Sequence, residues 1–379
     1  MGTAKRIAIL SIKAGAGHLR AAAALVEAFH EAYPSVEVRH IETLEYASAA
    51  FRKSFTGTYE RLVKHLPSVW RMIYEKLEAK PASSKTKKLT ALFDRIDSRR
   101  ILKEVEAFDP DRVICTHYFP AEILAARRRK GKLRGPVAVT LTDYDIHIMW
   151  IQEGVDRYFV ATDEMAYVLR AKGIGQATVG ATGIPIMPAF AKRSPGKKRM
   201  RQKLGLRPTP PTMLVAAGGF GLSGIDQTAA ALADATDDVQ LLAIAGRNEK
   251  LRKALEKVAR TRPGKIVPFG FVDNMHELMA ASDFAVTKCG GLTSSECMAM
   301  GLPMVIVSPV PGQEERNADF LLENGVGVRA NSPAHLLFKV RELIGDTARV
   351  ARMRAAARRV AKPRAAYHIA AEVMRLDGA

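Results

Sequence analysis

A short apolar run followed by a glycine loop and a helix constrains the fold of this chain more than any other feature. Residues 7–10 are apolar and Ser11 ends the predicted strand, Gly15 and Gly17 follow in a turn, and residues 18–32 have the periodicity of a helix. Further apolar runs alternate with helical segments at residues 36–41, 112–116, 136–142 and 157–161. Such alternation is typical of an α/β fold with a parallel sheet.

The second half of the chain repeats this alternation after a basic, proline-rich stretch. Its apolar runs lie at residues 212–217, 239–245, 265–268, 284–287 and 304–308. Since one hydrophobic core stops growing at roughly 250–300 residues, the 379 residues predict two domains. We expect an N-terminal domain over residues 1–190, a linker over 191–211, a second domain over 212–360, and a C-terminal helix over 361–379 that packs back on the first domain.

The cysteine content and the N-terminal residues predict in which cellular compartment the protein works. The chain has three cysteines, without CxxC spacing or the even number that staples a small secreted domain, which favours a reducing compartment. The first residues leave no room for a signal peptide, and no apolar stretch reaches the ~20 residues needed to cross a bilayer. The expected location is cytoplasmic, peripheral on the inner face of the cell membrane.

The formal net charge of +19 indicates an anionic partner. Residues 51–100 alone carry 13 Lys and Arg against five Asp and Glu, interleaved with aromatic and aliphatic residues. A basic aromatic segment suits an anionic membrane surface or a nucleic acid. The chain has neither zinc-ligand spacing nor an RNP-like aromatic pair, so we predict the membrane surface as the partner and expect no nucleic acid.

The N-terminal glycine loop ends in His18, at the carboxyl edge of the predicted sheet. Backbone amides at a helix N-terminus can bind an anion or a hydroxyl group there. The dinucleotide fingerprint requires a third glycine where this chain has Arg20, which disfavours nicotinamide or flavin. A neutral imidazole at this edge can accept a proton, so His18 is a candidate general base.

Polar and aromatic residues follow the strand predicted at residues 136–142. The Asp143-Tyr144-Asp145 sequence has the DxD spacing that can hold Mn²⁺ or Mg²⁺ with a nucleotide sugar, but three residues are a weak signal. We interpret Asp143, His147 and Trp150 as lining the acceptor side of a cleft, with no metal.

Glycine loops also follow strands of the second half. Gly218, Gly219, Phe220 and Gly221 would let the backbone approach phosphate oxygens, without the Lys-Ser/Thr ending of a Walker A loop. After the strand at residues 284–287, a helix N-terminus could hold a diphosphate, and Glu296 could accept hydrogen bonds from a ribose. The candidate residues here are Gly290, Gly291, Thr293, Ser294 and Glu296.

A third polar loop supplies carboxylates and amides suited to sugar hydroxyl groups, from Gln313, Glu314 and Asn317. The three loops lie at the ends of strands of one predicted domain. Together they favour a nucleotide-diphosphate-sugar as the ligand of the second half.

The ordered motifs resemble the family of monogalactosyldiacylglycerol synthases and bacterial diacylglycerol glucosyltransferases, relatives of the peptidoglycan lipid-linked N-acetylglucosaminyltransferase. The resemblance covers nearly the whole chain. It is carried by residues 15–18, 142–150 and 155–161 in the first half, and by residues 246–248, 270–275, 288–296 and 311–317 in the second.

This resemblance implies a GT-B fold, in which two Rossmann-like, doubly wound domains face each other across a cleft. It implies an inverting transferase that needs no metal or other cofactor. By this resemblance, His18 matches the proposed general base, Glu296 the ribose ligand, Gln313 and Glu314 the sugar contacts, and residues 271–275, with Phe271, Val272 and Met275, the uracil pocket. From the residues themselves we further expect Asp143 to assist His18 and Arg247 to meet the diphosphate. The expected acceptor side comprises Gly15, Gly17, His147 and Trp150. Phe220 departs from the polar residue that relatives often have.

The predicted function is transfer of a hexose from a UDP-sugar to diacylglycerol at the membrane surface. Two alternatives remain at this point. One is a transferase that adds N-acetylglucosamine to a polyprenyl-linked peptidoglycan precursor, and the other is a basic nucleic-acid-binding protein.

Overall fold

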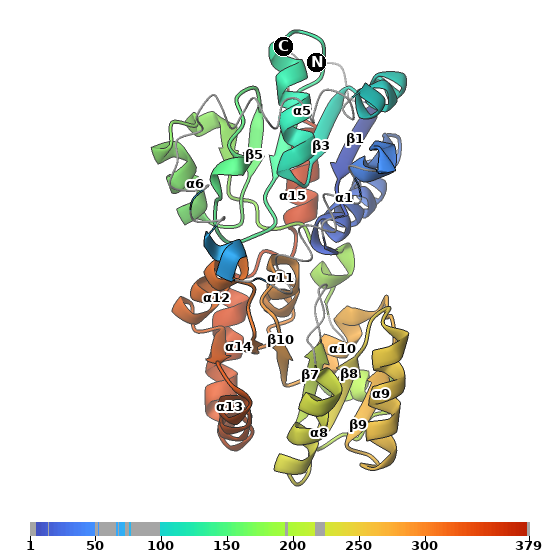
Figure 1. Cartoon of the computed structure of the whole chain (residues 1–379), viewed down its shortest axis with the longest axis vertical. Coiled ribbons are helices and arrows are strands. Elements are labelled where there is room, and N and C mark those ends of the chain that lie inside the picture. The colour runs from blue at the N-terminus through green and yellow to red at the C-terminus, as the bar shows by residue number, and fades with distance from the viewer. Residues whose placement is uncertain are drawn as a thin grey trace. The chain divides into compact units, whose positions relative to one another are not determined.

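The computed structural model describes residues 5–13, 15–49, 52, 66, 68–72, 76, 99–193, 196–216 and 224–376. The chain divides into two compact units, each considered by itself (Figure 1). Unit 1 comprises Met1–Pro188, Val310–Gln313 and Pro363–Ala379, and unit 2 comprises Ala189–Pro309 and Glu314–Lys362. Among the described residues, no helix is long and apolar enough to span a bilayer.

Unit 1 contains a parallel sheet whose described part has six strands in the order β2-β1-β3-β4-β5-β6. The central strands are buried along their length, as expected for a parallel sheet covered on both faces. The strands are β1 (Arg6–Ser11), β2 (Glu37–Glu42), β3 (Arg112–Cys115), β4 (Val137–Thr140), β5 (Arg157–Phe159) and β6 (Val179–Gly180).

A helix from the end of the chain completes the core of unit 1. Helix α15 packs on α1, and Figure 1 shows the red α15 beside the blue α1. The Arg157 guanidinium donates a hydrogen bond to the Glu372 carboxylate, and Arg112 Nε donates to the Leu376 carbonyl at 2.8 Å. The helices are α1 (Gly17–Ala32), α5 (Tyr118–Arg129), α6 (Asp163–Ala171) and α15 (Ala365–Val373), with short 3₁₀ turns η1 (Thr43–Tyr46), η2 (Ile148–Trp150), η3 (Gln176–Thr178) and η4 (Pro188–Ala191).

Unit 2 contains a second parallel sheet, again with six strands in its described residues, in the order β12-β11-β10-β7-β8-β9. Its core consists of strand residues and the apolar faces of the helices packed on them. The strands are β7 (Thr212–Ala216), β8 (Gln240–Ile244), β9 (Ile266–Phe269), β10 (Phe284–Thr287), β11 (Met304–Val307) and β12 (Gly327–Ala330).

Helices follow the strands of unit 2 in regular alternation. Pro363 follows the last of them, where a ring without an amide hydrogen cannot continue the helix. The helices are α7 (Lys197–Lys203), α8 (Ile225–Ala235), α9 (Glu249–Arg260), α10 (Met275–Ala281), α11 (Gly291–Ala299), α12 (Gln313–Glu323), α13 (Pro333–Gly345) and α14 (Thr347–Val360). The two parallel sheets with intervening helices confirm the predicted α/β fold class.

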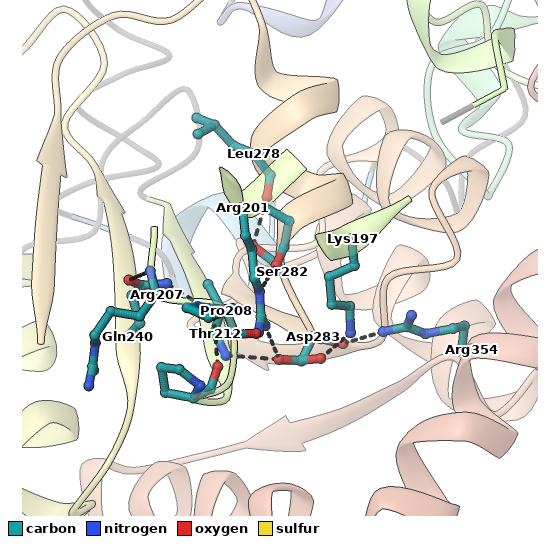
Figure 2. A network of polar contacts seen from close by, with 12 residues as sticks. Lys197, Arg201, Arg207, Pro208, Thr212, Gln240, Leu278, Ser282, Asp283 and Arg354 are labelled. Atoms are coloured by element: carbon teal, nitrogen blue, oxygen red, sulfur yellow. Dashed lines mark hydrogen bonds and ion pairs between the residues drawn. The ribbon is translucent and has the colours of Figure 1, made fainter. Parts of the chain in front are cut away.

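A polar network centred on Asp283 attaches α7 to the rest of unit 2 (Figure 2). The Asp283 carboxylate accepts hydrogen bonds from Arg201 Nη2 and the Thr212 amide, each at 2.8 Å, and pairs with Lys197. Arg201 is almost fully buried and also donates to the carbonyls of Pro208 and Ala281. Part of the segment predicted as a linker is therefore an ordered helix, tied to the starts of β7 and β10.

Candidate active site

The acceptor-side candidates lie where β1, β3 and β4 end in unit 1. Parallel strands present their carboxyl ends on one edge of the sheet, where ligands of such folds usually bind. Gly15 adopts φ of +83°, a left-handed conformation that favours glycine, in the turn between β1 and α1. The turn places His18 as the second residue of α1, at the end of the helix whose amides are free.

Two threonines from neighbouring strand ends contact the His18 ring. Nδ1 of His18 lies 2.7 Å from the Thr116 carbonyl oxygen and 3.2 Å from Thr142 Oγ1. A carbonyl only accepts hydrogen bonds, so Nδ1 carries the proton and donates it to Thr116. Nε2 is then the basic nitrogen of the neutral ring.

The environment of His18 favours this neutral form. Burial lowers its pKa from the ordinary value of 6.5 to about 4, while the hydrogen bond to the Thr116 carbonyl opposes the shift. At neutral pH, His18 is therefore unprotonated at Nε2 and can accept a proton from a hydroxyl group.

Aromatic rings surround His18. The His117 ring lies edge to face against it, with centroids 4.6 Å apart, and the centroid of Trp150 lies 6.2 Å away. Tyr118 stacks on His117 at 4.2 Å. The sequence analysis selected Trp150 but missed His117 and Tyr118, although they directly follow the strand predicted at residues 112–116. Their position at a strand end was the signal that could have found them.

The other acceptor-side candidates belong to the turn after β4. Asp143 is half-buried and follows Thr142, whose hydroxyl reaches His18. His147 is buried and accepts a hydrogen bond from the Met149 amide at 3.3 Å, which caps η2 and places Trp150. Among the described residues, no group of three or more His, Cys, Asp or Glu side chains is arranged to hold a metal ion.

In unit 2, the N-terminus of α11 follows β10 through Cys289 and Gly290. Gly290 occupies the capping position without a side-chain cap, so amides of the first turn remain available to a ligand. Ser294 lies in this turn, and its buried hydroxyl has no hydrogen-bond partner in the described part of the chain. The predicted residues Gly291, Thr293 and Ser294 thus stand together at one helix end.

Three buried polar side chains accompany this helix end. Glu296 is 5% exposed, Glu314 9% and Asn317 0%, and each has polar contacts. Cys289 Sγ donates to the Glu314 backbone carbonyl at 3.0 Å, and a Cβ placed on Gly290 would lie 3.8 Å from Glu314 Oε1. The first turn of α12 begins with Gln313. Through Glu314, this turn lies against the start of α11.

A separate pair of candidates meets at the ends of β8 and β9. The Arg247 guanidinium lies 4.5 Å from the centroid of the Phe271 ring, a cation–π contact, and Phe271 is 58% exposed. Val272 follows Phe271, and Met275 begins α10. Gly218, Gly219, Phe220 and Gly221 lie outside the described residues.

Models of known families match both halves of the chain. Residues 18–186 match the family described as monogalactosyldiacylglycerol (MGDG) synthase, and residues 196–360 match glycosyl transferases group 1. The first match spans every acceptor-side candidate from His18 onward. The second spans the donor-side candidates of unit 2.

Curated relatives match over most of their length. A processive diacylglycerol beta-glucosyltransferase of Bacillus pumilus is 28% identical over 362 residues, which cover 93% of this chain and 90% of the relative. An enzyme of the same name from Bacillus subtilis is also 28% identical, over 93% of this chain and 91% of its own. These matches confirm the resemblance inferred from the sequence motifs.

Solved structures share the fold. MurG of Acinetobacter baumannii superposes with a TM-score of 0.64 at 16% identity, covering 98% of this chain and 100% of its own. A UDP-glucosyltransferase from Polygonum tinctorium gives 0.63 at 14% identity, with 100% of both chains covered. A UDP-GlcNAc 2-epimerase from Neisseria meningitidis gives 0.60 at 14% identity, over 97% and 99%. The predicted GT-B fold is thereby confirmed, and it hosts more than one reaction.

Proposed function

We propose that this chain is a member of the family of monogalactosyldiacylglycerol synthases and processive diacylglycerol glucosyltransferases, and that it transfers a hexose from a UDP-sugar to diacylglycerol. The observation that carries the proposal is the state of His18. Its Nδ1 proton is held by the Thr116 carbonyl and burial keeps it neutral, so Nε2 is a base ready for an alcohol.

On the acceptor side, the diacylglycerol hydroxyl group loses its proton to Nε2 of His18 as its oxygen attacks the anomeric carbon. Asp143 assists from the turn that also carries Thr142, and Gly15, Gly17, His147 and Trp150 shape the acceptor site. General base catalysis of this kind contributes about 10²–10⁴ in rate. Direct displacement inverts the configuration at the anomeric carbon.

On the donor side, the sugar–phosphate bond breaks and UDP leaves with a developing negative charge. The amides at the start of α11, the Ser294 hydroxyl and Arg247 meet that charge, with Gly218, Gly219 and Gly221 as further proposed contacts. Fixed donors of this kind are worth roughly 3–4 kcal/mol each in oxyanion holes. Phe271, Val272 and Met275 hold the uracil, Glu296 the ribose, and Gln313, Glu314 and Asn317 the sugar. No metal is needed for this arrangement.

The proposed place of reaction is the inner face of the cell membrane. The basic aromatic segment over residues 51–100 would dock there on anionic lipid headgroups. Most of that segment lies outside the described residues. Three of its described side chains, Leu66, Val69 and Met72, are apolar and 48%, 37% and 47% exposed, which supports contact with a lipid surface.

The test is incubation with diacylglycerol and each common UDP-hexose in turn, with a chelator present, followed by mass analysis of the lipids. The expected product is a hexosyl diacylglycerol formed equally well with chelator. Parallel reactions supply UDP-N-acetylglucosamine with a polyprenyl-linked acceptor, or without any acceptor to detect epimerisation. Activity in either parallel reaction, together with no hexosyl diacylglycerol from any UDP-hexose, would overturn the proposal.

A further inference from the structure

A second buried histidine packs directly against the proposed base. His117 is the second of the two residues between β3 and α5 and is 5% exposed. Its ring meets the His18 ring at an interplanar angle of 89°, with centroids 4.6 Å apart. Edge-to-face contacts at this separation favour one relative orientation of the two rings.

The hydrogen bond made by His117 determines where its own proton lies. Nδ1 of His117 is 3.1 Å from the Phe119 amide, which donates to it and so caps α5. Nδ1 is therefore the acceptor nitrogen, and the proton of the neutral ring is on Nε2. Burial, and next the charge of a protonated His18, lower the pKa of His117 well below 6.5. At neutral pH each ring is therefore uncharged and carries one proton, on Nδ1 of His18 and on Nε2 of His117.

Several elements close around this pair. Trp150 of η2 lies 6.0 Å from His117 between ring centroids, and Tyr118 of α5 lies 6.1 Å from Trp150. Thr116 and Thr142 face His18 from the ends of β3 and β4. The ionisable side chains of the adjoining turn are Asp143, Tyr144, Asp145 and His147. Together the aromatic rings leave the His18 ring little freedom to rotate away from the Thr116 carbonyl.

We propose that His117 is a positioning residue for His18: its neutral ring holds the His18 ring on the Thr116 carbonyl and keeps Nε2 of His18 as the basic nitrogen. The catalytic consequence of this role rests on the proposed function. The packing itself does not, and neither the family matches nor the sequence motifs single out His117.

Two substitutions separate positioning from helix capping. His117→Asn keeps an acceptor for the Phe119 amide but removes the ring, whereas His117→Phe keeps a ring but removes the acceptor. If His117 positions His18, His117→Asn lowers kcat at least about tenfold with an unchanged KM for the UDP-sugar, and His117→Phe lowers kcat less. If His117 only caps α5, His117→Phe is the more damaging change and His117→Asn has the kcat of the wild type, which would overturn the proposal.

Titration of the His18 ring by NMR gives a readout that needs no substrate. Asn is smaller than His and admits water, so the pKa of His18 rises in His117→Asn from about 4 toward its ordinary 6.5, and the acid limb of the pH profile moves with it. In His117→Phe the pKa of His18 stays low. Unchanged titration of His18 in His117→Asn would refute the positioning role even if the enzyme proved not to transfer hexose. Should His117→Asn fail to fold, a raised pKa of His18 in His117→Phe would refute it as well.

Discussion

At the scale of single residues, one backbone carbonyl decides which nitrogen of His18 can act. The Thr116 oxygen lies at the end of a central strand whose neighbours on both sides are hydrogen-bonded to it, so its position is fixed by the sheet. A side-chain carboxylate in the same place would raise the pKa of His18, whereas a carbonyl orients the ring without adding a full charge. His18 therefore combines a defined tautomer with a low pKa.

Replacing His18 by Ala should separate catalysis from donor binding. We expect kcat to fall by about 10²–10⁴, because the base is lost, while the Kd for UDP measured by calorimetry stays unchanged. His30→Ala is the matched control, since His30 is exposed in the last turn of the same helix. Near-normal turnover in His18→Ala would refute the assignment of the base.

The buried histidines also predict a pH dependence of stability. Folding lowers the pKa of His18 to about 4 and that of His117 well below 6.5, so the unfolded chain binds more protons than the folded chain as the pH falls below 6.5. Between pH 7 and pH 5 the free energy of unfolding should fall by about 2 kcal/mol through His18, and further in the same direction through His117. Urea unfolding of the wild type and of His18→Ala at both pH values measures this, and equal losses in the two proteins would contradict it.

The candidate site was predictable from sequence where a residue type and a strand end coincide. Gly15, Gly17 and His18 form a motif with a chemical meaning, so His18 could be selected from the sequence. The strand-end position of His117 could have marked it as a candidate, but no glycine loop or other motif accompanies it, so its chemical role could not be predicted from the sequence. Its relation to His18 depends on β1 and β3 being neighbours in the sheet, although about 100 residues separate the two histidines.

At the scale of elements, the start of α11 carries the buried Ser294 hydroxyl, which has no hydrogen-bond partner in the part of the chain that the structure describes. Ser294→Ala should leave the free energy of unfolding nearly unchanged, because the buried hydroxyl makes no hydrogen bond within the described residues. The Kd for UDP should rise about fivefold, or about 1 kcal/mol, if the hydroxyl binds the diphosphate.

The control for this prediction is Ser295→Ala. Ser295 Oγ already donates to the Gly291 carbonyl at 2.8 Å, so its loss should affect stability and not UDP binding. Thermal unfolding and calorimetry on both variants decide the matter. A destabilised Ser294→Ala with unaltered UDP affinity would argue against the proposed diphosphate site.

Because Asp283 attaches α7 to the rest of unit 2, replacing its carboxylate should strongly lower the stability of that unit. Asp283→Asn should lower the free energy of unfolding of unit 2 by about 3 kcal/mol, because Arg201 would remain buried without its partner. Asp234→Asn is the control, since Asp234 forms an exposed ion pair with Arg262 and its loss should change stability little. Equal unfolding midpoints in urea for the two variants would contradict this role of Asp283.

Two strands, β6 and β12, and the helix α7 were not predicted from the sequence, because their residues lack the usual local patterns. The central strands are apolar throughout and were predicted, but β6 has two residues and β12 contains Gly327 and Arg329, so neither has a strand pattern. Lys197 to Lys203 is so basic that it resembles a linker. It is held as a helix by Asp283, a partner about 80 residues away, which local periodicity cannot reveal.

At the scale of the whole molecule, the charge of residues 51–100 predicts electrostatic membrane binding. The protein should sediment with vesicles that contain anionic phospholipid, and binding should weaken as salt rises. Replacing Lys85, Lys87 and Lys88 by Glu should weaken it further, since each cation near the surface contributes about 1 kcal/mol. Neutral vesicles are the control. Sedimentation that ignores both salt and anionic lipid would rule out this role for the segment.

Helix α15 has a consequence for how the protein is made. Ile369, Ala370 and Val373 pack into the same core as Leu25 and Phe29 of α1, which are synthesised first. While the ribosome is still translating, the nascent N-terminal half presents an uncovered apolar surface, open to chaperones and to aggregation. We therefore expect this half to finish folding only after the chain has been released from the ribosome. Fusion tags or nonsense mutations that disturb α15 should reduce the yield of the folded N-terminal half.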